Sequence, residues 1–146
     1  MKISNRNLSI FLFFVCILSR VATSIFHIED IDSLRFALSL HEFNVLKLQP
    51  HFPGYPVFIV LAKGIYFITK SMGITFSIIG GLSLFVLIIF TLKLFYIKLN
   101  SVQGLLCASL LFLNPFFWLM SNRYMPDLMG LCVSIASLNF LITSAN

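Results

Sequence analysis

The stretch ITFSIIGGLSLFVLIIFTL, residues 74–92, decides the fold class of this chain. It approaches the ~20 apolar residues that a helix rising 1.5 Å per residue needs to cross the hydrocarbon core of a bilayer. Lipid offers no water to the backbone, so a helix is the form in which such a stretch satisfies its own N–H and C=O groups. We therefore predict a membrane-spanning helix here.

Three more apolar stretches of similar length predict three more spans. They cover residues 8–26, 104–120 and 128–143. The Asn114-Pro115 pair inside the second of these predicts a kink, because proline cannot donate the helical hydrogen bond. Arg20 lies inside the first, where a charge either faces a cavity or extends to the membrane interface.

The composition agrees with a lipid environment. Of the 146 residues, 59% are hydrophobic and 10% are charged, against about 25% charged in a soluble domain. So little charge cannot cover a water-facing surface, which makes the bilayer the expected partner. The ten lysines and arginines form no basic run, so no nucleic-acid surface is expected. The predicted fold is all-α, with residues 1–146 as a single polytopic transmembrane region of four spanning helices.

A fifth apolar stretch, residues 55–69, is short for a span. At 1.5 Å per residue it reaches about 22 Å, less than the ~30 Å hydrocarbon core, and Lys63 lies in its middle. The pattern is compatible with a short crossing, a half-inserted helix or an interfacial helix. We expect this helix to be shorter and more tilted than the four spans.

Residues 27–54 form the one substantial polar segment and hold four of the five acidic residues. These are Glu29, Asp30, Asp32 and Glu42. The spacing of apolar side chains predicts an amphipathic helix at about residues 33–43, capped by Asp32 or Ser33. With residues 55–69 it would form a juxtamembrane helix pair in a first external loop.

The basic residues predict the orientation of the first span. Lys2 and Arg6 precede it, so the N-terminus is expected in the cytoplasm and residues 27–54 on the extracytoplasmic side. A retained anchor helix is favoured over a cleaved signal peptide by the length of the run, and both give the same orientation.

Lys93 and Lys98 follow the second span with no acid nearby, which favours a cytoplasmic loop at that point. That arrangement requires residues 55–69 not to cross the membrane. Asp127 then shares the extracytoplasmic face with Asp32. If residues 55–69 do cross, the two lysines lie outside and Asp127 lies inside.

Four polar residues are candidates for chemistry, and each has a structural alternative. Asp30 and Asp32 are either loop acids that cap a helix or a general base and metal ligand. His51, between two prolines, is either a surface residue or a ligand for an anion or a metal. Asp127 is either the N-cap of the last span or a functional acid.

Three motifs carry a resemblance to a known family. They are DIDSLRFA at residues 30–37, QPHFPGYP at residues 49–56, and Asn114-Pro115 followed by RYMPD at residues 123–127. Their order and spacing resemble the N-terminal part of the GT-C membrane glycosyltransferases. Within that family the chain is similar to the branch of protein O-mannosyltransferases and lipid A aminoarabinose transferases.

The resemblance implies transfer of a sugar from a polyprenyl-phosphate-linked donor to an acceptor hydroxyl. Asp32 would be the catalytic base, with Asp30 beside it and Asp127 as the second loop acid. The implied substrate-binding residues are His51, Arg35, Arg123 and Tyr55. The arginines, or a divalent metal as cofactor, would stabilise the departing phosphate.

Enzymes of this family are several times longer, so the resemblance implies a truncated form, and its activity is an open question. The alternative is a small non-catalytic multi-span protein that associates with a membrane protein partner through helix contacts. Small residues at Gly80, Gly81 and residues 104–108 would allow such close approach of helices.

Overall fold

The computed structural model describes residues 4–145, so Lys2, which the orientation argument uses, lies outside the described residues. Within this range the chain forms helices and no strand, which confirms the all-α class. The elements are α1 (Asn5–Ala22), α2 (Ile31–Ser39), the 3-10 helix η1 (Val45–Lys47), α3 (Pro56–Thr69), α4 (Met72–Leu94), α5 (Val102–Leu113), α6 (Pro115–Met120) and α7 (Asp127–Ala145).

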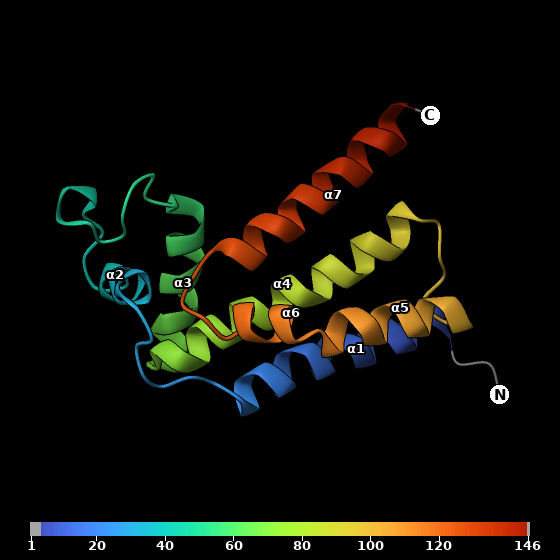
Figure 1. The fold of residues 1–146 in the computed structure, drawn as a ribbon, viewed down its shortest axis with the longest axis horizontal. Helices are drawn as coiled ribbons and strands as arrows, with labels where there is room; N and C mark the ends of the chain where they lie inside the picture. The colour runs from blue at the N-terminus through green and yellow to red at the C-terminus, as the bar shows by residue number, and fades with distance from the viewer. Residues whose placement is uncertain (1–3, 146) are drawn as a thin grey trace.

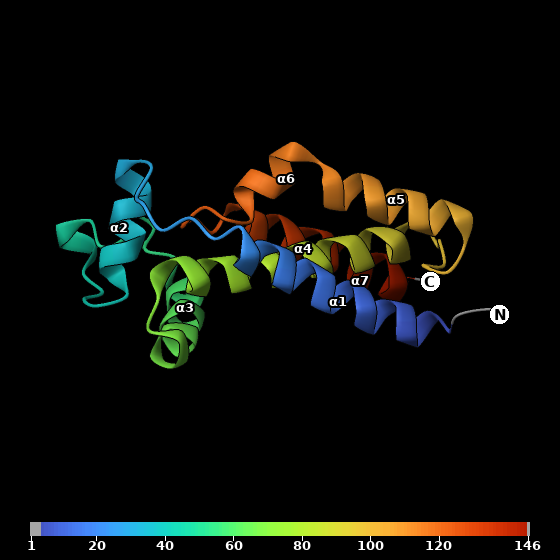
Figure 2. The same cartoon turned by 90° about the horizontal axis from the view of Figure 1, so that it is seen from below.

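Helix α4 is the centre of the molecule. It packs against α1 on one side and α7 on another, and α5 lies alongside (Figures 1 and 2). Its residues are apolar around the whole circumference, which is the composition of a helix buried among other helices. Leu84 and Ile88 are fully buried, in one cluster with Cys16 of α1 and Cys132 of α7.

Two adjacent glycines allow the neighbours of α4 to approach its backbone. A Cβ atom added at Gly80 would lie 1.7 Å from the carbonyl oxygen of Ser121, and one at Gly81 would lie 2.8 Å from that of Cys16. A Cβ at Gly104 would likewise lie 2.1 Å from the carbonyl oxygen of Lys98. The small residues predicted to serve helix association therefore serve contacts within this chain.

Three helices, α1, α4 and α7, are long and apolar enough to cross a membrane. They indicate a multi-pass membrane protein. The stretch predicted as a further span, residues 104–120, is instead divided into α5 and α6. Asn114 has an extended backbone and its side chain accepts hydrogen bonds from the Phe116 and Phe117 N–H groups, which starts α6 afresh. The predicted kink at Asn114-Pro115 is confirmed as this break.

Helix α3 runs across one end of the bundle at a steep angle to α1 and α4 (Figures 1 and 2). Its 14 residues are fewer than the 18, 23 and 19 of the three long helices. The expected tilt relative to the membrane stays a prediction. Helix α3 is therefore shorter than those three helices, as expected. It is not shorter than α5, which has 12 residues because Asn114-Pro115 ends it.

Segments far apart in the sequence meet at the end of the bundle where α2, η1 and α3 lie (Figure 1). The Asn122 amide donates to the Thr23 carbonyl at 3.1 Å, and the Tyr124 hydroxyl donates to the Ile25 carbonyl at 2.6 Å. At the opposite end, the Asn100 N–H donates to the Asn5 side chain at 3.2 Å. Residues 27–54 and the start of α7 therefore share one end of the bundle. The side of the membrane that this end faces stays a prediction.

Arg20 joins α1 to the broken helix pair and is fully buried. Its Nε donates to the Ser121 hydroxyl at 2.6 Å and its Nη2 to the Phe112 carbonyl at 3.2 Å. The guanidinium lies 3.7 Å from the centre of the Trp118 ring, a cation–π distance. Of the two placements expected for Arg20, the structure shows the inward one. Protein groups surround the guanidinium, which does not face an open cavity.

Candidate functional site

The N-terminus of α2 is built on Asp30, and this corrects the predicted cap. Asp30 Oδ1 accepts the Ser33 N–H at 2.7 Å, so Asp30 is the N-cap in place of Asp32 or Ser33. The helix consequently begins at Ile31, and it ends at Ser39, before the predicted Phe43. An N-cap oxygen satisfies one of the N–H groups that the first turn leaves without a helical partner.

The second oxygen of Asp30 is also occupied. It forms an ion pair with Nη2 of Arg123, which comes from the loop between α6 and α7. Arg123 Nε lies 3.4 Å from the Glu29 carboxylate. The Ser33 backbone N–H, with Arg123 adding to it, holds the pKa of Asp30 below its ordinary value. Asp30 and Arg123 thus connect two loops that are 93 residues apart in the sequence.

Asp32 differs from Asp30 because only one of its oxygens is engaged. Oδ1 accepts a hydrogen bond from Arg35 Nη1 at 3.0 Å and lies 3.5 Å from His51 Nδ1. Within residues 4–145 no group bonds Oδ2, and the side chain is 40% exposed. A carboxylate that is oriented through one oxygen and open at the other has the geometry of a general base.

His51 is held against α2 by aromatic contacts. Its ring packs edge-on against Phe36 at 5.4 Å and against Tyr55 at 5.7 Å. Nδ1 is buried and, among the described residues, has no partner with hydrogen-bond geometry, because the Asp32 oxygen lies at the limit of that distance. His51 is therefore a half-buried neighbour of Asp32 and not a freely solvated surface residue.

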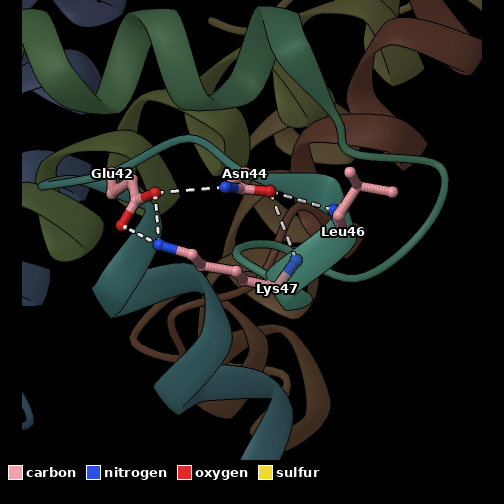
Figure 3. Close-up of polar contacts among 4 residues, drawn as sticks. All are labelled: Glu42, Asn44, Leu46 and Lys47. Atoms are coloured by element: carbon pink, nitrogen blue, oxygen red, sulfur yellow. Dashed lines mark hydrogen bonds and ion pairs between the residues drawn. The ribbon is translucent and has the colours of Figure 1, made fainter.

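The turn before His51 is fixed by a small polar network that the sequence analysis missed. Lys47 Nζ donates to Glu42 at 2.8 Å, and Asn44 Oδ1 accepts the N–H groups of Leu46 and Lys47 (Figure 3). The Asn44 N–H also donates to the Gln49 carbonyl at 2.7 Å. An Asn side chain that bonds the N–H two residues later is the signal for such a turn. The closed turn directs residues 49–56 back toward α2.

Asp127 lies apart from this cluster, at the first residue of α7. It lines an open cavity of about 470 Å³ together with Tyr55, Phe58 and Met129. Within the described part of the chain the Asp127 carboxylate has neither a hydrogen bond nor an ion pair. Tyr55 contacts His51 and also lines the cavity, so Tyr55 is the residue that connects the cavity with the histidine near Asp32.

The structure thus joins five of the seven predicted site residues by polar contacts in two groups, and Tyr55 contacts His51 through its ring. Asp32, Arg35 and His51 form one, and Asp30 and Arg123 form the other. In residues 4–145 no group of three or more acidic, histidine or cysteine side chains is arranged to hold a metal ion. Comparison with known proteins adds no relative: no family model, curated protein or solved structure matches the chain.

Proposed function

We propose that this chain is a membrane glycosyltransferase of the GT-C type, which transfers a sugar from a polyprenyl-phosphate donor to an acceptor hydroxyl. The observation that carries the proposal is the carboxylate of Asp32, whose Oδ1 is held by Arg35 near His51 while its Oδ2 is open. Tyr55, which contacts His51, also lines a largely apolar cavity. An apolar cavity with a few convergent polar groups is the usual form of a ligand site. Asp32 is chosen over Asp30 because both oxygens of Asp30 are already engaged.

In the proposed reaction Asp32 accepts the proton of the acceptor hydroxyl. The hydroxyl oxygen forms a new bond to the anomeric carbon of the sugar, while the bond from that carbon to the phosphate oxygen breaks. Polyprenyl phosphate leaves with the electron pair of the broken bond. Arg35, which pairs with Asp32, and Arg123 would be the cationic donors that stabilise the phosphate charge, and His51 would meet the donor phosphate. Tyr55 and Asp127 would line the side of the cavity that receives the donor.

The proposal includes a membrane topology finer than three spans. We take α5 and α6 together as a fourth crossing, since their combined length from residue 102 to residue 120 suffices for about 28 Å. Helices α2 and α3 form the juxtamembrane pair. The N-terminus is cytoplasmic together with Arg6, Lys93 and Lys98, and the site faces the extracytoplasmic side.

The test compares Asp32→Asn with Glu42→Gln in membranes that contain the chain. Loss of a positioned base lowers a rate by ~10²–10⁴-fold. We expect Asp32→Asn to lower the rate of polyprenyl phosphate release by that factor, at unchanged protein level. The substrates are radiolabelled polyprenyl-phosphate hexoses and pentoses. Glu42→Gln removes an acid of the same loop that pairs only with Asn44 and Lys47, and it should retain activity.

Two results would contradict the proposal. One is an equal rate for Asp32→Asn and the wild type, which would return Asp32 to the role of a loop acid. The other is release of no polyprenyl phosphate by the wild-type chain from any of these donors, which would favour the non-catalytic alternative.

A further inference from the structure

The end of the bundle opposite the acids contains a second polar cavity. It has a volume of about 500 Å³, and the side chains that line it include Asn5, Lys93, Tyr96, Lys98 and Asn139. All five acidic residues of the chain lie in residues 27–54 or at the start of α7, which is the other end. Two lysines and no acidic residue are therefore among the residues that line this cavity.

The turn after α4 places both lysines on this cavity. Ile97 N–H donates to the Leu92 carbonyl at 2.9 Å and Tyr96 N–H to the Lys93 carbonyl at 3.0 Å, which is the hydrogen-bond pattern of a Schellman turn. Tyr96 has φ +55°, in the left-handed region that a bulky side chain rarely adopts. The reversal returns the chain so that Lys98 faces the same space as Lys93.

The position of the cavity along α4 matches the headgroup layer. The 23 residues of α4 are about 34 Å long, slightly more than the ~30 Å hydrocarbon core. Lys93 is in the last turn of α4, so in a bilayer that α4 crosses it would lie at the level of the lipid headgroups. Asn5 uses its Oδ1 to accept the Asn100 N–H, which leaves its amide N–H groups for a ligand.

We propose that this cavity binds a phosphate group, supplied by the headgroup of an anionic phospholipid in the adjoining leaflet. Two local contacts explain why a lysine is favourable at position 93. A cation is stabilised at the C-terminus of α4, and the Lys93 Nζ lies 4.7 Å from the centre of the Phe90 ring. They do not account for Lys98, which lies beyond the helix end and shares the cavity. Basic pockets between transmembrane helices at the cytoplasmic side are suited to anionic headgroups.

The test uses the full chain in detergent and two phosphate sources, phosphatidylglycerol and inorganic phosphate, with zwitterionic phosphatidylcholine for comparison. Bound lipid is counted by native mass spectrometry, and phosphate binding by the shift in the thermal midpoint of unfolding. Lys93→Gln/Lys98→Gln should lower the affinity for phosphatidylglycerol on the order of 20-fold, at about 5-fold per lysine. Lys63→Gln/Lys70→Gln on and after α3 removes the same charge and should leave that affinity unchanged.

Specific loss in the Lys93/Lys98 variant supports the site, and the probe that binds identifies the source. Retention of phosphatidylglycerol in the presence of millimolar phosphate points to the lipid, and its displacement points to a free phosphate. The proposal is overturned if both double variants lose affinity equally. It is also overturned if the wild type binds phosphatidylglycerol no better than phosphatidylcholine and is not stabilised by phosphate.

Discussion

At the scale of single residues, two aspartates of one motif have different surroundings. Asp30 closes the first turn of α2 and pairs with Arg123, whereas Asp32 keeps one oxygen open beside His51. The sequence placed both acids in the right loop but assigned the cap to the wrong position. Ser, Asp and Asn are all good N-caps, so composition alone cannot choose between neighbours that both qualify.

The two contacts of Asp30 can be separated by substitution. Asp30→Asn keeps a side-chain oxygen that can cap α2 but loses the ion pair, whereas Asp30→Ala loses both. We expect hydrogen exchange of the α2 amides to be faster in the Ala variant than in the Asn variant by about 5-fold, equivalent to a cap worth ~1 kcal/mol. Equal exchange in the two variants would contradict the capping role.

The same carboxylate gives the loop a dependence on pH. The pKa of Asp30 lies below its ordinary value, so its ionised form stabilises the folded loop at every pH above that ordinary value. The contribution is lost as the pH falls through the lowered pKa. After correction for intrinsic exchange rates, protection of α2 should therefore decrease in strongly acidic solution, and this step should be absent from Asp30→Asn.

At the scale of helices, the path of the chain depends on what proline and glycine allow. The break between α5 and α6 was predictable from Asn114-Pro115, since proline removes a donor and Asn can cap the restart. The partners of Arg20 were not predictable, because Ser121 and Phe112 are about a hundred residues away and no local pattern links them. The same holds for the choice of α4 as the central helix.

The close packing on α4 gives a stability prediction. Gly80→Ala would push a methyl group into the backbone at Ser121, so we expect the free energy of unfolding in mixed micelles to fall by about 3 kcal/mol. Gly64→Ala on α3 meets no atom within 4 Å and, as a helical position, should be neutral or stabilising by up to ~1 kcal/mol. An equal effect of both substitutions would contradict the packing described for Gly80.

At the scale of the whole molecule, the acidic residues lie at one end of the bundle, whereas basic residues lie at both ends, since Arg35 and Arg123 pair with acids. The acids gather with α2 and the start of α7, and Lys93 and Lys98 lie at the other end. The gathering of the acids was predictable, because four of the five lie within residues 27–54 of the sequence. The ion pair between Asp30 and Arg123 was not predictable, since it joins loops 93 residues apart that no local pattern links.

The arrangement of both loops at one end is the central claim, and cysteine labelling in intact cells tests it most directly. Single cysteines would replace Leu46, Asp127 and Lys98, which are all exposed, with the wild-type chain as the blank for its three natural cysteines. An impermeant maleimide should label positions 46 and 127 in intact cells and position 98 only after permeabilisation. Labelling of position 46 from outside while position 127 requires permeabilisation would contradict the account, because α3 would then cross the membrane.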